Sequence, residues 1–227
     1  MASQQSAPGE MNDRKPSMSI LKQRFYRQAL KLETKTRFTC IEIEGLLRIF
    51  DKLVEKYNSP MTKPVLKDVL FNFFGLTNDI MMDKIFRTMA SGKSTMTYED
   101  WIIGMDIYLR GTLKQLANFA FTVYDHQRRD FLSKEDIQMY LKNILAAHIP
   151  DEDAEECQTD MLDMVFLLLD RDKDGYVSRK DFVDSVLVEP LLLQILGECL
   201  PSARTAMTLN SLVQQESGRL DSYATQE

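Results

Sequence analysis

The sequence is poor in the residues that interrupt helices or build covalent frameworks. Its 227 residues include only nine glycines and seven prolines, which favours a helical protein with short connections. The three cysteines, Cys40, Cys157 and Cys199, are an odd number at wide spacing and fit no zinc pattern. We expect them to be reduced thiols in a cytosolic protein.

Long apolar runs and an excess of positive charge are also missing. No run approaches the roughly 20 apolar residues that span a bilayer, and the polar first 20 residues do not resemble a secretory signal. Residue 2 is Ala rather than Gly, which excludes N-myristoylation. The net charge of −6 argues against a general role on nucleic acid. The sequence therefore predicts no membrane anchor and no nucleic-acid partner.

Catalytic groups are equally scarce. The two histidines, His126 and His148, fall in predicted loops with no cysteine or serine partner nearby. Because no nucleophile–base pair is indicated, we expect no enzymatic activity.

What the chain does contain is a four-fold repeat. Each copy is an apolar residue, a Ser or Thr, three mixed residues and a second apolar residue. The hydroxyl residue can cap a helix that begins just after it, and an amphipathic helical run precedes each copy. The copies lie at 61–66, 96–101, 132–137 and 177–182, and the preceding runs at about 40–57, 78–89, 112–124 and 156–169. This helix–loop–helix unit, used four times, is the arrangement of the EF-hand.

The repeat predicts an all-α fold of two EF-hand pairs, in which short β-bridges join the paired loops. We pair Met61 with Met96 and Leu132 with Val177 across these bridges. The acidic, proline-containing segment 147–153 is interpreted as an exposed connector. The expected organisation is a basic, partly helical N-terminal extension (1–37), an N-terminal lobe (38–110), a C-terminal lobe (111–200) and a polar, partly disordered tail (201–227).

Only the last loop, 170–181, has the residues of a calcium site. Calcium takes six to eight oxygens from loop positions 1, 3, 5, 7, 9 and 12, with Gly at position 6 for the sharp turn. Gly175 occupies position 6. The candidate ligands are Asp170, Asp172, Asp174, the backbone carbonyl of Tyr176, Ser178 (with or without a bridging water) and Asp181.

The residue at position 12 bears on the choice of ion. Asp181 stands where Glu usually supplies two oxygens, and its side chain is one methylene shorter. One oxygen fewer favours six-fold coordination, which weakens calcium binding and helps magnesium compete. We therefore predict a single site of modest calcium affinity at which Mg2+ competes with Ca2+.

The other three loops lack a complete set of ligands. The third begins at Asp125 but has Arg129 at position 5 and Asp130 at position 6, so a fixed positive charge stands where the cation should be. At about 4 Å that repulsion costs roughly 4 kcal/mol even at an effective dielectric of 20. Arg129 is expected to pair with a nearby carboxylate and hold the loop shut. The second loop (89–100) and the first, with Val65 at position 12, have no metal site.

Two further features leave alternatives open. Residues 14–37 carry eight Lys or Arg against one Glu and form a basic amphipathic run. This run either binds an acidic partner or packs on the N-terminal lobe. Methionines in the hands, such as Met81, Met82 and Met164, are as compatible with an adaptable groove for a partner helix as with core packing.

Three more segments carry a family resemblance. They are FFGLTNDIMMDKIFR (73–87), WIIGMDIYLRGTL (101–113) and EPLLLQILGECLP (189–201). Through them the chain resembles the calaxin family, EF-hand proteins of cilia and flagella that are related to neuronal calcium sensors. The resemblance covers roughly 38–201 and includes the long gap before the last loop.

The resemblance implies a role in the docking complex that fixes outer dynein arms to doublet microtubules. Coiled-coil docking proteins, outer-arm dynein and doublet microtubules are the implied partners, and the axoneme of a cilium or flagellum is the implied location within the cytoplasm and cytoskeleton. Calcium-dependent tuning of dynein is also implied. Of the family's metal loops only 170–181 carries over, because 89–100 lacks the acids and 125–136 contains Arg129. The residues before 38 have no counterpart in the family pattern.

An alternative hypothesis is a regulatory calcium-binding subunit of a cytosolic enzyme, similar to the B subunit of calcineurin. A third, a calcium buffer, is poorly supported because one weak site stores little calcium.

Overall fold

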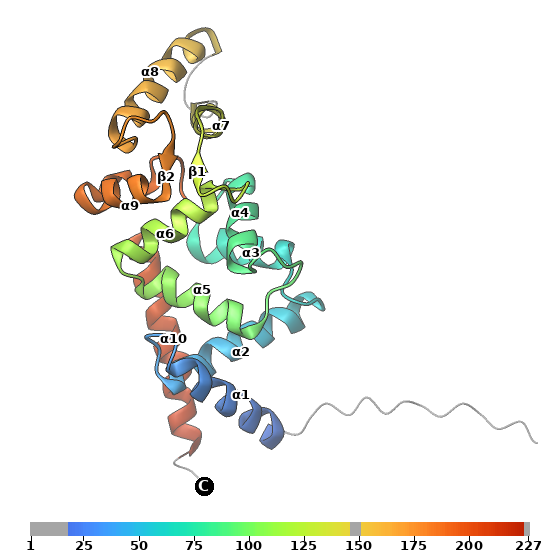
Figure 1. Ribbon diagram of the computed structural model, residues 1–227. Coiled ribbons are helices and arrows are strands. Elements are labelled where there is room, and N and C mark those ends of the chain that lie inside the picture. The colour runs from blue at the N-terminus through green and yellow to red at the C-terminus, as the bar shows by residue number, and fades with distance from the viewer. Residues whose placement is uncertain (1–17, 146–150, 225–227) are drawn as a thin grey trace, which may run out of the picture.

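The computed structural model describes residues 18–145 and 151–224, and this part of the chain is almost entirely helical (Figure 1). The predicted all-α class is therefore confirmed. In chain order the elements are α1 (Met18–Glu33), α2 (Cys40–Tyr57), α3 (Lys63–Phe74), α4 (Asp79–Met89), α5 (Tyr98–Arg110), α6 (Leu113–Tyr124), β1 (Phe131–Leu132), α7 (Lys134–Leu145), α8 (Asp151–Leu169), β2 (Val177–Ser178), α9 (Arg179–Val188), the 3-10 helix η1 (Pro190–Gln194) and α10 (Ala203–Ala224).

The helices form four helix–loop–helix units, α2–α3, α4–α5, α6–α7 and α8–α9, as the repeat predicted. Capping residues fix where the second helix of a unit begins. The Thr97 hydroxyl accepts a hydrogen bond from the N–H of Asp100, whose carboxylate accepts in return from the N–H of Thr97. Ser178 and Asp181 make the same reciprocal pair at the start of α9.

Short antiparallel pairings join the loops within each EF-hand pair. In the C-terminal lobe β1 pairs with β2 in the predicted register. In the N-terminal lobe the N–H of Met96 donates to the carbonyl of Met61 at 2.9 Å, and Thr62 pairs with Thr95. This is also the predicted register, because placing Thr62 opposite Thr95 in an antiparallel pair places Met61 opposite Met96.

One hydrophobic core runs through both lobes. Trp101 of α5 is buried, and its indole N–H donates to the carbonyl of Leu46 in α2 at 3.2 Å. In the C-terminal lobe the rings of Phe121 (α6) and Phe182 (α9) pack together. The buried residues of the two lobes belong to one continuous cluster, and α4 packs against α6. The lobes are therefore in direct contact.

The segment that follows η1 is tied to both lobes by phenol groups. The Tyr108 hydroxyl (α5) donates to the carbonyl of Cys199, and the Tyr124 hydroxyl (α6) donates to the carbonyl of Gly197, each at 2.7 Å. Burial raises the pKa of the Cys199 thiol to about 12, so this thiol stays protonated at neutral pH. All three cysteines are free thiols, as the spacing predicted.

Of the two alternatives for the basic N-terminal run, the structure favours packing on the N-terminal lobe. Phe25, Ala29 and Leu32 share one face of α1 and are buried, and α1 packs against α2. Residues 1–17 of the expected extension lie outside the described part of the chain.

Two segments differ from their expected conformation. Helix α8 begins at Asp151, so the last residues of the connector predicted at 147–153 belong to a helix, and 146–150 lie outside the described residues.

The tail expected to be partly disordered instead forms helix α10, which lies along α2 and α5 (Figure 1). Leu209 and Val213, four residues apart, are buried against the N-terminal lobe. Arg110 of α5 also donates to the side-chain oxygen of Asn210 at 3.2 Å. The tail is mostly polar, so its composition offered little sign of this short apolar stripe. The stripe packs the helix against the N-terminal lobe. Residues 225–227 lie outside the described chain.

None of the helices in the described residues has the combination of length and apolar character that a membrane crossing requires.

Substituting both Leu209 and Val213 by Asp is expected to release α10 from the N-terminal lobe. The change removes two buried apolar side chains, each contributing about 1.5–3 kcal/mol, and places charge in their stead. The apolar surface of α2 and α5 then becomes accessible, which a rise in the fluorescence of a hydrophobic dye would report. Met207→Asp is the matched control, because Met207 is 69% exposed on the same helix. Equal dye binding by the two variants would contradict the docking of α10 through these residues.

Candidate metal centre

The loop between α8 and α9 has a backbone shaped by its first carboxylate. The Asp170 side chain accepts hydrogen bonds from the N–H of Asp174 at 3.2 Å and from the N–H of Gly175 at 3.0 Å. Lys173 and Gly175, at positions 4 and 6, have φ values of 61° and 85°. Glycine adopts this left-handed conformation without steric cost, so Gly175 at position 6 allows the sharp turn of the loop without backbone strain.

This loop brings three of the predicted ligands together. Oxygens of Asp170, Asp172 and Asp174 lie within 4.8 Å of one another. That separation fits a shared ion, because oxygens bound at about 2.4 Å to one calcium lie at most about 4.8 Å apart. Among the described residues, no Lys or Arg forms an ion pair with these three carboxylates. Their mutual repulsion would be relieved by a divalent cation, so the donor set fits calcium.

The other three predicted ligands are engaged differently. Asp181 is buried, and its Oδ2 accepts from the hydroxyl and the N–H of Ser178 in the cap of α9. The N–H of Tyr176 donates to Asp174 at 2.8 Å, and the Tyr176 ring packs edge-on against Phe131 across the β-bridge. Asp181 is therefore not part of the three-carboxylate group, and the roles of Tyr176, Ser178 and Asp181 as ligands stay predictions.

The third loop has the same backbone as the fourth despite its different side chains. Asp125 accepts from the N–H groups of Arg129 at 3.0 Å and Asp130 at 2.7 Å, the same two positions that donate to Asp170 in the last loop. Positions 4 and 6 are again left-handed, with φ values of 58° at Arg128 and 65° at Asp130. Asp130 adopts this left-handed conformation although it has a side chain, so its backbone is more strained than that of glycine would be.

An internal guanidinium occupies this loop where an ion would be held. The Arg129 guanidinium pairs with Asp136, the position-12 carboxylate, as the sequence predicted. Gln127, at position 3, donates to the other oxygen of Asp136 at 3.4 Å. The carboxylate that would close on a metal ion therefore closes on a side chain of its own loop.

The second loop uses the same device, which the sequence analysis missed. The Lys93 ammonium, at position 5, lies 2.9 Å and 3.0 Å from the two oxygens of Asp100 at position 12. Burial opposes ionisation of Asp100, but hydrogen bonds from Thr97 and Lys93 outweigh it and lower the pKa of its carboxyl. The signal available in the sequence was a basic residue followed seven positions later by Asp, which occurs in both the second and the third loop.

The first loop has no such pair. Val65, at position 12, is buried in the core, and Asn58, at position 5, adopts a left-handed φ of 45°. A buried aliphatic side chain cannot ligate a cation, so this loop is held by packing and by its backbone pairing with the second loop.

Converting the third loop into a metal site requires replacing its internal cation. Arg129→Asp together with Asp130→Gly removes the guanidinium, adds a ligand at position 5 and relieves the backbone at position 6. We expect calorimetry or equilibrium dialysis to report one more bound Ca2+ per chain than in the unmodified protein. Arg128→Asp with Asp130→Gly is the matched control, because position 4 supplies no ligand. A gain of an ion in the control, or none in the Arg129 variant, would contradict the role assigned to Arg129.

Comparison with known proteins agrees with this architecture. A family model described as an EF-hand domain pair matches residues 114–187. Calaxin of Xenopus laevis is 32% identical over 176 residues, covering 75% of this chain and 85% of the relative. The calaxins of Homo sapiens and Mus musculus are 30% and 31% identical over 182 and 183 residues, each covering 78% of this chain and 86% of the relative. The chain belongs to the calaxin family, as a divergent calcium-binding EF-hand protein.

Proposed function

We propose that the protein is a non-enzymatic EF-hand subunit of the ciliary or flagellar axoneme. In this role it helps dock outer dynein arms to doublet microtubules through coiled-coil docking proteins, and tunes dynein with calcium. Membership of the calaxin family supports the proposal. The observation that carries it is the internal cation in two of the four loops, since a subunit that must keep its shape at every calcium level gains from loops that need no ion.

The degenerate loops support a constitutive structure. Lys93 and Arg129 neutralise the position-12 carboxylates of their loops whether calcium is present or absent. The β-bridges keep each loop joined to its neighbour, so the helices of an EF-hand pair stay in register without bound metal. A docking subunit holds its partners continuously, which suits a scaffold of this kind.

An apolar surface on the C-terminal lobe supports contact with a helical partner. Leu167 at the end of α8 is 80% exposed, and Met164 on the same helix is 61% exposed. Val188 at the end of α9 and Leu191 in η1 are 75% and 87% exposed. Exposed apolar side chains are positions at which a partner can bury apolar surface, so these four residues are the proposed contacts for the docking proteins.

The last loop supplies the calcium response in this proposal. Asp170, Asp172 and Asp174 would hold one ion, and Asp181 would complete the shell through Oδ1, which accepts no hydrogen bond within the described chain. With one carboxylate oxygen at position 12 the site accommodates Mg2+ as well as Ca2+. The site is thus a tuning element on a scaffold that holds its shape without it.

Removing one carboxylate of the cluster tests the metal site. Asp170→Asn is expected to weaken Ca2+ binding by at least tenfold and to abolish competition by Mg2+, because it removes charge from the first ligand position. Asp181→Glu is expected to strengthen Ca2+ relative to Mg2+, because the longer side chain can offer two oxygens. Calorimetric titration with each ion measures both effects. Asp184→Asn serves as control, since Asp184 lies on α9 outside the loop and pairs with Lys180.

The docking role is tested by variants of the apolar surface in ciliated cells. We expect the protein to co-extract with outer-arm dynein and doublets with or without calcium chelation, and Leu167→Asp with Leu191→Asp to abolish this association. Ile80→Asp, at a residue 52% exposed on α4, is the control for adding charge to an exposed apolar position. Failure to co-extract with dynein, with recovery of a cytosolic phosphatase or kinase instead, would favour the alternative of an enzyme subunit similar to calcineurin B.

A further inference from the structure

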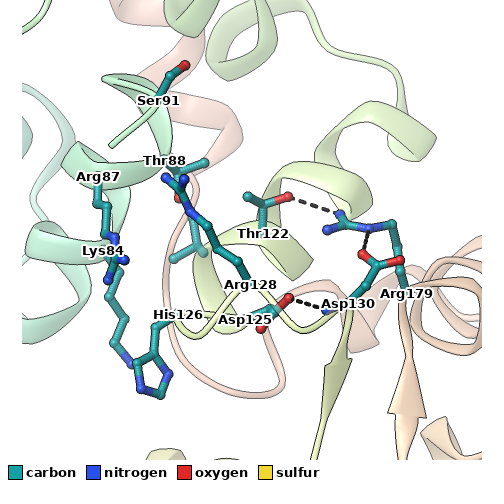
Figure 2. Close-up of a pocket in the computed structure, with 11 residues that line it drawn as sticks. Lys84, Arg87, Thr88, Ser91, Thr122, Asp125, His126, Arg128, Asp130 and Arg179 are labelled. Carbon is teal, nitrogen blue, oxygen red and sulfur yellow. Dashed lines mark hydrogen bonds and ion pairs between the residues drawn. The ribbon is translucent and has the colours of Figure 1, made fainter. Parts of the chain in front are cut away.

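A basic cavity lies where the second and third EF-hands meet. It has a volume of about 390 Å3 and is lined by the last turns of α4, the loop that follows α4, the end of α6 and the third loop. Figure 2 shows Lys84, Arg87 and Arg128 on one side and the Arg179–Asp130 pair on the other. No metal ligand of the last loop contributes to it.

Positive charge exceeds negative charge in this cavity. Asp125 and Asp130 supply its two carboxylates, against four Lys or Arg side chains. Both carboxylates are already engaged, because Asp125 accepts from two backbone N–H groups and Asp130 pairs with Nε of Arg179 at 2.5 Å. Among the described residues, the guanidinium groups of Arg87 and Arg128 form no ion pair or hydrogen bond.

The arrangement places these cations in a defined geometry. Arg128 lies against the backbone of Gly92, where an added Cβ would stand 2.7 Å from its Nη2 atom. Gly92 has a φ of 81°, so the turn and the approach of Arg128 both depend on the missing side chain. Lys84 is held from the other side, because its ammonium donates to the Tyr140 hydroxyl at 2.5 Å. Thr88 and Ser91 line the same cavity with hydroxyl groups.

Neutralising the partial negative charge at the C-terminus of a helix explains only some of the Lys and Arg side chains in this cavity. Arg87 lies in the last turn of α4, where a cation offsets the partial negative charge of the helix C-terminus. Arg128 belongs to the third loop and reaches across to the second hand, which that role does not require. Half-burial lowers the pKa of Lys84 to about 8, with Asp136 opposing the shift, so keeping this lysine charged is costly in the free protein.

We propose that this cavity binds the dianion of a phosphate group, carried by a phosphorylated serine or threonine of a partner polypeptide or present as free phosphate. Arg87 and Arg128 supply planar donors that match phosphate oxygens, Lys84 adds a point charge, and Ser91 and Thr88 add hydroxyl donors. Among the described residues, no Phe, Tyr or Trp lines the cavity to stack on a nucleobase, so the phosphate itself is the recognised group.

His126 gives a direct readout at the edge of the cavity. Burial lowers the pKa of its imidazole, and Lys84 and Arg87 of α4 lower it further, while Asp136 of α7 and Asp125 at the end of α6 oppose them. Arg128 of the third loop also faces the cavity. A bound dianion stabilises the protonated imidazole, so phosphate is expected to raise the pKa of His126. The chain has only two histidines, and a His148→Gln variant identifies the His126 signal.

The test uses the full chain with three probes, namely inorganic phosphate, a short phosphoserine peptide and the same peptide unphosphorylated. Proton NMR follows His126, and calorimetry measures affinity. Phosphate and the phosphopeptide are expected to bind saturably and raise the pKa of His126, and the unphosphorylated peptide is expected to do neither. Tighter binding of the phosphopeptide than of phosphate would assign the site to a modified partner, and equal binding would assign it to the free ion.

Arg87→Gln with Arg128→Gln is the decisive variant, since both side chains are exposed and unpaired and their loss leaves the core intact. Each lost charge-assisted contact is expected to weaken binding by about tenfold. Arg27→Gln with Arg204→Gln removes the same charge from α1 and α10 and is expected to bind like the unmodified protein. Unchanged binding by the Arg87 and Arg128 variant, or a His126 pKa that does not respond to saturating phosphate, would overturn the proposal.

Discussion

The carboxylate at the last position of an EF-hand loop needs a positive charge opposite it, and the structure supplies that charge in different ways. In the second loop the Lys93 ammonium meets Asp100, and in the third the Arg129 guanidinium meets Asp136. In the fourth loop, position 5, which Lys93 and Arg129 occupy in the other two loops, is Asp174. The positive charge must therefore come from an external cation. Because Asp125 and Asp170 organise their loops through the same N–H groups, replacing the ion by a side chain changes the chemistry and keeps the backbone.

The charge pairing inside the third loop also affects helix α9, because this loop is bonded to the fourth loop and to the start of α9. The third and fourth loops are joined by β1 and β2, and Arg179 at the start of α9 also pairs with Asp130 of the third loop. One end of α9 is therefore fixed to a loop whose charge balance does not depend on calcium.

The two lobes present their apolar surfaces differently. One face of the N-terminal lobe is covered by a helix of its own chain, with Leu209 and Val213 of α10 buried against α2 and α5. Leu167 and Leu191 in the C-terminal lobe have no such cover within the described chain and are 80% and 87% exposed.

The sequence by itself determined the repeat, the caps and the bridge register, and it predicted that three loops lack a complete set of metal ligands. These features depend on residues close in the chain, such as Ser178 and Asp181, where spacing fixes geometry through the helix and turn itself. It also placed Arg129 opposite a carboxylate, although the equivalent pairing of Lys93 went unnoticed.

Only the tertiary structure decided where α10 lies and how Arg128 comes to face Gly92. Those arrangements join residues far apart in the chain, and local propensity carries no information about such contacts. The polar tail illustrates the reason, because a helix with two buried residues is stabilised by the surface that receives it rather than by its own composition.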